Sequence, residues 1–122
     1  MPFIQPSKLP QMELFAGIHG AIVAGEKLML SFLELEPNAE VPEHSHPHEQ
    51  AGLVLAGRLR FRIGSEERVV GAGEAFVIPS HAVHWGVVEE GPARVLDLFS
   101  PPRQDYLERY GRTARAPGSS PA

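Results

Sequence analysis

The chain of 122 residues contains no cysteine and one tryptophan. Without cysteine it can form neither a disulfide nor a thiolate metal site, and it has no cysteine nucleophile. Basic residues are also few: 11 lysines and arginines stand against 15 aspartates and glutamates, and the net charge is −4. No apolar run approaches the roughly 20 residues that span a bilayer, and the first residues lack the basic and apolar segments of a signal peptide. These absences favour a cytoplasmic protein that binds neither nucleic acid nor membrane.

The length, with a hydrophobic content of 43%, suits one domain around one core. Residues 1–11 include three prolines and predict an irregular N-terminal arm. Residues 12–110 are expected to form the single domain. Residues 111–122 consist mostly of small residues, proline and arginine, and we expect them to be a disordered tail.

Short apolar or alternating segments separated by turn residues predict an all-β sandwich or barrel. The clearest alternation runs from Arg58 to Ile63, with apolar side chains on one face and arginines on the other. Residues 28–33 are apolar on both faces, which predicts a strand covered by a second sheet or by a partner subunit, and we therefore expect a homodimer. One helix is expected at residues 103–110. The expected strands are residues 12–15, 18–24, 28–36, 51–56, 58–63, 67–70, 74–78, 81–88 and 93–99.

Half of the six histidines fall in the segment His44–Gln50. On an extended strand, side chains two residues apart share a face, so His44 and His46 can bind one ion together. Gln50 has the same parity, and its amide oxygen is an acceptable ligand. A fourth donor must come from elsewhere, and His84 is the best candidate. Three imidazoles and an amide predict a site for one divalent ion, with zinc, nickel, manganese and iron all compatible.

The other polar residues near the cluster have less direct roles. His48 shares the parity of the ligands, but Pro47 disturbs the strand there, and we expect His48 behind the ligands or at the pocket rim. Glu49 is expected to point away from the ion. His19 and His81 are expected to be surface or supporting residues.

The spacing of this segment resembles the first motif of the cupins, G-x5-H-x-H-x3,4-E-x6-G. It is carried here by His44, His46, Gln50 and Gly57. Gln50 stands where cupins usually have a glutamate, and Asn38 replaces the opening glycine.

The second cupin motif, G-x5-P-x-G-x2-H, is matched by Gly73, Pro79 and His84, with His81 in place of the internal glycine. The resemblance covers roughly residues 28–99. It implies a double-stranded β-helix, or jelly-roll, barrel with a short C-terminal helix, and a metal ion inside it.

A closer resemblance is to the KdgF-type pectin-degradation cupins, which share H-S-H-P-H-E-Q and D-x-F-S-P-P-R-x-D-Y. The second sequence is found here from Asp97 to Tyr106. The resemblance implies a non-redox isomerase that opens 4,5-unsaturated monouronates, the products of pectin and alginate lyases, into linear 5-keto-4-deoxyuronates. It assigns metal binding to His44, His46, Gln50 and His84, and catalysis to Asp97, Phe99 and Arg103.

The residue chemistry is compatible with that reaction. A neutral Gln50 leaves the full charge of the ion, which favours an anionic sugar as substrate. Asp97 has the parity of Phe99 on the last strand and can act as a base if that face lines the barrel. The guanidinium of Arg103 suits a carboxylate. Two alternatives stay open: another small metal-binding cupin, such as a dioxygenase or a different isomerase, and a non-catalytic cupin that binds a sugar or another small molecule.

Overall fold

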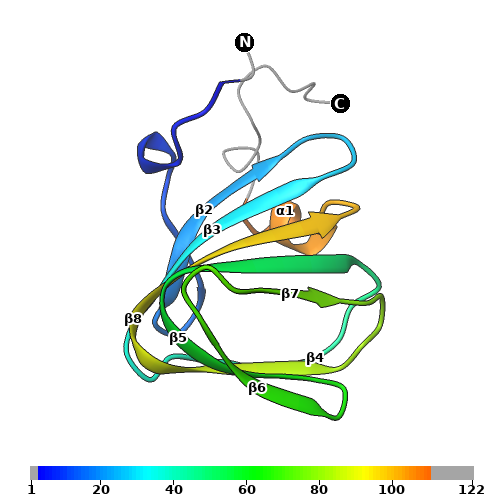
Figure 1. Cartoon of the computed structure of the whole chain (residues 1–122). Helices are drawn as coiled ribbons and strands as arrows, with labels where there is room; N and C mark the ends of the chain where they lie inside the picture. The colour runs from blue at the N-terminus through cyan, green and yellow to red at the C-terminus, as the bar shows by residue number, and fades with distance from the viewer. Residues whose placement is uncertain (1–2, 111–122) are drawn as a thin grey trace.

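The computed structural model describes residues 3–110, in which one antiparallel sheet curls into a barrel and a short helix packs at its end (Figure 1). This confirms the expected all-β fold with one C-terminal helix. The expected tail, residues 111–122, lies outside the described residues. Over the described part of the chain, no helix is both long enough and apolar enough to cross a bilayer.

Eight strands form the sheet in the order β1-β2-β3-β8-β5-β6, with β4 paired to β8 and β7 paired to β5. The elements are η1 (Pro6–Lys8), β1 (Met12–Phe15), β2 (Ile18–Ala24), β3 (Met29–Leu35), β4 (Glu40–His44), β5 (Glu49–Ile63), β6 (Glu66–Gly71), β7 (Ala75–Ile78), β8 (His84–Ser100) and α1 (Gln104–Tyr110).

Two predicted breaks in the strands are wrong. Residues 51–56 and 58–63 belong to one strand, β5, and residues 81–88 and 93–99 fall largely in one strand, β8. The β5–β8 pairing shifts register between Val54 and Leu59, so both strands bend without separating. Gly57 makes this possible: its φ is 79°, and a Cβ there would lie 2.8 Å from Ala93. The two bent strands connect the halves of the barrel (Figure 1).

The core consists of two clusters. One fills the barrel between the strands and includes Ile18, Val54 and Val95. The other joins β2 and β3 to the helix through Ile22, Met29, Phe99, Tyr106 and Leu107. Helix α1 is therefore fixed to the open end of the barrel, directly after the last strand.

Strand β3 is apolar on both faces, as predicted, but only one face is fully covered. Met29 and Ser31 point inward and are buried, whereas Leu30 and Phe32 on the other face are half-buried. Leu28 precedes the strand and is 51% exposed. The outer face of the sheet is thus partly open in the single chain.

Candidate metal centre

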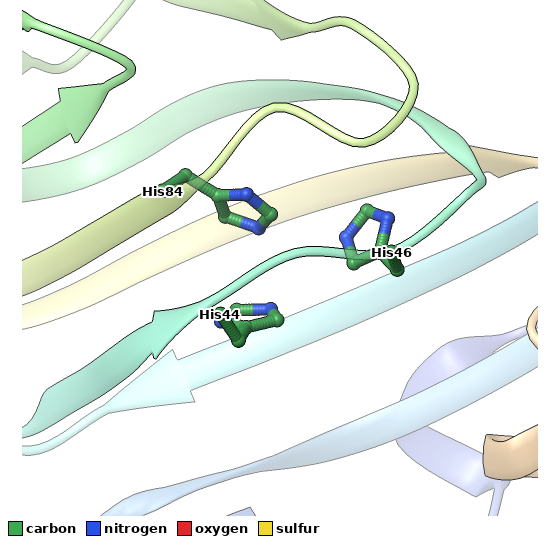
Figure 2. A group of neighbouring side chains, drawn as sticks. All are labelled: His44, His46 and His84. Atoms are coloured by element: carbon green, nitrogen blue, oxygen red, sulfur yellow. The ribbon is translucent and has the colours of Figure 1, made fainter.

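Three histidines, His44, His46 and His84, lie close together (Figure 2). His44 ends β4, His46 lies in the following loop, and His84 begins β8, directly across the β4–β8 pair from His44. One potential ligand atom from each lies within 4.8 Å of the others. Antiparallel pairing thus brings together residues that are forty positions apart in the sequence.

The ring orientation of all three histidines is fixed by the backbone. Because a carbonyl only accepts, each Nδ1 must carry the proton, which leaves each Nε2 with a free lone pair. The three Nδ1 contacts are His44 to Pro42 at 2.8 Å, His46 to His48 at 3.0 Å and His84 to Ala82 at 2.9 Å. This is the tautomer in which Nε2 can bind a metal.

Burial also keeps the rings of His46 and His84 neutral. Desolvation lowers the pKa of His84 to about 4 and shifts the pKa of His46 below its usual 6.5. The Nε2 atom of His84 is buried and has no hydrogen-bond partner within the described chain. A buried, neutral imidazole with an unused lone pair is the form that binds a divalent cation.

Gln50 completes the donor set from strand β5. Its side chain is buried, and its Oε1 atom lies 3.0 Å from Nε2 of His46. Three imidazole nitrogens and an amide oxygen fit zinc, nickel, manganese or iron. The residues present therefore fit the single divalent ion that the sequence predicts.

Asp97 is the buried carboxyl nearest to this donor set. It points inward from β8 and is 7% exposed. Burial raises the pKa of Asp97 to about 7, although a hydrogen bond from Gln50 and the charge of Arg103 act in the opposite direction. Its Oδ1 atom has no hydrogen-bond partner among the described residues. A carboxyl with this pKa can exchange a proton near neutral pH.

Arg103 is also buried, and it is held from three sides. Its Nε and Nη2 atoms donate to the two carboxylate oxygens of Asp105, at 3.2 and 2.8 Å. Its Nη1 donates to the hydroxyl of Tyr106 at 3.1 Å, and the guanidinium carbon lies 3.9 Å from the centre of that ring. The ring of Phe99 is 5.3 Å away on another side. These contacts fix the direction of the guanidinium.

One cavity joins these groups. Its polar lining comes from His44, Gln50, His84, Asp97 and Arg103, together with Tyr106. Most of the remaining wall is apolar, and Phe61 stacks on Phe76 there with ring centres 4.4 Å apart. The cavity is thus a largely apolar chamber with a small number of polar groups in its wall.

Comparisons with known proteins agree with this geometry. The model of the cupin domain family matches residues 31–99, more than half of the chain. The chain belongs to the cupin family.

Among individual proteins, this cupin is 31% identical over 100 residues to pectin degradation protein KdgF of Dickeya dadantii (strain 3937), covering 80% of this chain and 91% of the relative. The solved structure of KdgF from Halomonas sp. has a TM-score of 0.81 and 34% identity, covering 86% of this chain and 97% of that chain. An RmlC-like cupin from Shewanella frigidimarina NCIMB 400 has a TM-score of 0.80 and 26% identity, covering 85% and 94%.

The remaining histidines of this cupin lie outside the converging set. His48 is half-buried, and its pKa is lowered mainly by burial and secondly by the positive charge of Arg103. His81 is exposed, has a φ of 68°, and donates its backbone N–H to the carbonyl of His46 at 2.8 Å, which ties the two motifs together. His19 is half-buried on β2, and Glu49 is exposed.

Asp105 and Tyr106 lie outside the candidate site that the sequence predicts. They stand two and three residues after Arg103 in the D-x-F-S-P-P-R-x-D-Y stretch, which was the available signal. What the stretch did not reveal is that both side chains turn back onto the same guanidinium.

Proposed function

We propose that this cupin converts 4,5-unsaturated monouronates into linear 5-keto-4-deoxyuronates, with His44, His46, Gln50 and His84 as metal ligands. The observation that carries the proposal is one buried carboxyl, Asp97, next to Gln50 in the cavity that is also lined by His44 and His84 of the histidine cluster. Similarity to KdgF proteins supports the same reaction.

Asp97 acts in this proposal as the group that moves the proton. It accepts the proton of the anomeric hydroxyl, the C1–O5 bond opens, and C1 becomes an aldehyde. The electrons released to O5 are delocalised over C5 and C4. A proton delivered to C4 then gives the 5-keto product, so atoms and electrons balance without an oxidant. A pKa of about 7 suits both directions of this transfer.

Arg103 and Phe99 orient the sugar. Two hydrogen bonds to Asp105 and one to Tyr106 hold the guanidinium at the cavity wall, where it can bind the uronate carboxylate. Phe99 is 2% exposed, lines the cavity, and packs between His46 and Arg103. The bound divalent ion would supply Lewis-acid stabilisation of the negative charge that develops on oxygen.

The test is loss of the 4,5-unsaturated chromophore when protein loaded in turn with zinc, nickel, manganese and iron is mixed with the monouronate. We expect turnover by the native chain and by Glu49→Gln, a neighbouring exposed control, but not by His84→Ala or Asp97→Asn. Unchanged absorbance with every metal contradicts the proposal. Oxygen uptake with iron alone would instead identify a dioxygenase, and sugar binding without any product would identify a non-catalytic cupin.

The same proposal includes a homodimer in the cytoplasm. The outer sheet face presents apolar side chains in register, since Phe32 on β3 and Leu53 on β5 both pair with Leu96 on β8. Val77 on the neighbouring strand β7 is 59% exposed. A second copy covering this face removes it from water. Light scattering is expected to give a dimer that Leu53→Lys dissociates, and a monomeric native chain would contradict it.

A further inference from the structure

Strand β3 carries one polar residue on its inward face. Ser31 is 1% exposed, and its hydroxyl oxygen is buried without a hydrogen-bond partner among the described residues. The flanking inward residues on the same strand are Met29 and Leu33. A hydroxyl kept in such surroundings is costly unless it is paired.

The strand register leaves one polar neighbour for this hydroxyl. On one side Ser31 lies opposite Ile22 of β2, and on the other side it lies opposite Asp97 of β8. The next inward pairs on β8 are Met29 with Phe99 and Leu33 with Val95, all apolar. Directly opposite residues in an antiparallel pair have Cβ atoms about 4.5–5.5 Å apart and point to the same face.

Asp97 also has a polar atom that lacks a hydrogen bond. Its Oδ1 atom is buried and has no hydrogen-bond partner in the described chain, while Gln50 donates a hydrogen bond to the carboxyl. The residue opposite Asp97 on β5 is Gly52, which has no side chain to offer. Two residues that each have a buried polar atom without a hydrogen-bond partner among the described residues therefore lie directly opposite each other on β3 and β8.

We propose that the hydroxyl of Ser31 is the hydrogen-bond donor that completes Asp97, directly or through one buried water, and so positions the carboxyl for proton transfer. Gln50 on one side and Ser31 on the other then fix the plane of the carboxyl. Ser31 is a positioning residue, because Asp97 lines the cavity and Ser31 is not among the residues of its wall. The inference rests on the proposed role of Asp97 and extends the site to strand β3.

This arrangement gives the hydroxyl a defined effect on the reaction. An unanchored carboxyl rotates and samples fewer productive orientations, so the chemical step slows while substrate binding changes little. Loss of the donor also leaves an acceptor buried and unpaired. Both effects predict a split between kcat and KM that general loosening of the barrel would not produce.

The first experiment measures turnover of the unsaturated monouronate by metal-loaded variants. Ser31→Ala is expected to lower kcat about tenfold, the effect of losing one hydrogen bond to a charged group, with KM changed less than about twofold. Ser31→Thr keeps the hydroxyl and is expected to restore most of the activity. The matched control is Ser100→Ala, which removes a hydroxyl bonded to the Lys27 carbonyl. Unchanged kcat in Ser31→Ala overturns the proposal.

The second experiment does not depend on turnover. Thermal unfolding in the presence of Zn²⁺ is compared for Ser31→Ala in the native background and in Asp97→Val. We expect Ser31→Ala to lower the unfolding midpoint in the native background but to leave or raise it in Asp97→Val, where the hydroxyl has lost its polar neighbour across the β3–β8 pair. Equal changes in both backgrounds overturn the pairing.

The two experiments separate the possible failures. If the native chain turns over no uronate, the proposed function fails while the unfolding comparison still decides whether the two residues interact. If turnover occurs but Asp97→Asn is fully active, the role of Asp97 fails and Ser31 loses its catalytic meaning. Coupling in unfolding together with a lower kcat in Ser31→Ala supports both.

Discussion

The Oε1 atom of Gln50 lies 3.0 Å from the Nε2 atom of His46, and both atoms are hydrogen-bond acceptors. The Nδ1 proton of His46 is committed to the carbonyl of His48, so Nε2 has no hydrogen to donate. Two lone pairs at this distance repel each other unless a cation lies between them. The contact therefore fits two donors that would share one cation, and without a cation it carries an electrostatic cost.

Metal binding is expected to stabilise the fold. A divalent ion at 100 times its dissociation constant contributes about 2.7 kcal/mol, which corresponds to a rise of about 10 °C in the unfolding midpoint of a domain of this size. Calorimetry with zinc or nickel and with a chelator measures the difference. His84→Ala is expected to remove the metal-dependent rise. His19→Ala, which removes a histidine far from the cluster, is expected to keep it, and loss of the rise in both variants would contradict the assignment.

The neutral amide of Gln50 predicts a specific response to Gln50→Glu. A carboxylate ligand binds the cation more tightly but removes one unit of net positive charge from the site. We expect tighter metal binding in titration calorimetry and a KM for the monouronate raised about tenfold or more, as one unit charge at close range allows. Glu49→Gln, an adjacent and exposed change of opposite sign, is the control. An unchanged KM would show that the ion does not attract the substrate.

The pH dependence of stability in metal-free protein follows from two opposed groups. Burial lowers the pKa of His84 from 6.5 to about 4, so stability falls as the pH drops from 6.5 toward 4 and the unfolded chain takes up a proton first. Burial raises the pKa of Asp97 from 3.8 to about 7, so stability rises as the pH drops from 7 and the folded chain takes up a proton first. The two slopes have opposite signs between pH 4 and 6.5.

The native metal-free chain should therefore change little in stability over this range. The pKa of His46 is also lowered by burial, so the free energy of unfolding should decline only gently as the pH falls. Asp97→Asn removes the compensating group, and its stability should fall more steeply, by at most about 1.4 kcal/mol per pH unit for that proton. Urea unfolding with a chelator from pH 4.5 to 7 measures both slopes. Parallel curves for the two proteins would show that Asp97 is not protonated by burial.

Much of this fold could be predicted from alternation and turn residues, because those signals are local. Strands β1, β2 and β6 lie within about one residue of their expected bounds. Gly57 was predicted as a turn, since sequence cannot show that β8 continues to pair along the bend. Strand β4 was not among the expected strands, because its outward side chains give it little apolar pattern.

The candidate site likewise has a part that the local sequence predicts and a part that it does not. His44, His46 and Gln50 follow from parity within one short segment, and His84 was added as the remaining suitable donor. Contacts that depend on register between strands could not be predicted, and the pairing of Ser31 with Asp97 is one of them. The turn of Asp105 back onto Arg103 depends on where α1 begins, which local sequence does not fix to one residue.

The paired hydrogen bonds from Arg103 to Asp105 predict that Asp105 supports binding of the substrate carboxylate. Asp105 accepts two hydrogen bonds from the guanidinium although its own side chain is 59% exposed, while Arg103 is only 10% exposed. Asp105→Asn breaks the paired geometry, because an amide has one acceptor oxygen, while the guanidinium keeps its hydrogen bond to the Tyr106 hydroxyl and its contacts with the rings of Tyr106 and Phe99. Substrate binding should weaken more than the chemical step, with KM raised about tenfold and kcat changed less than about threefold.

Two comparisons make this prediction specific. Glu66→Gln disrupts the exposed ion pair with Arg68 on the outer surface and should leave both constants unchanged, because such pairs contribute little and lie outside the cavity. Tyr106→Phe keeps the ring under the guanidinium but removes the hydroxyl that accepts from Nη1, so its effect on KM should be smaller than that of Asp105→Asn. If Asp105→Asn lowers kcat with KM unchanged, Arg103 acts on the developing charge of the reaction rather than on the carboxylate of the bound sugar, since only interactions confined to the transition state change kcat alone.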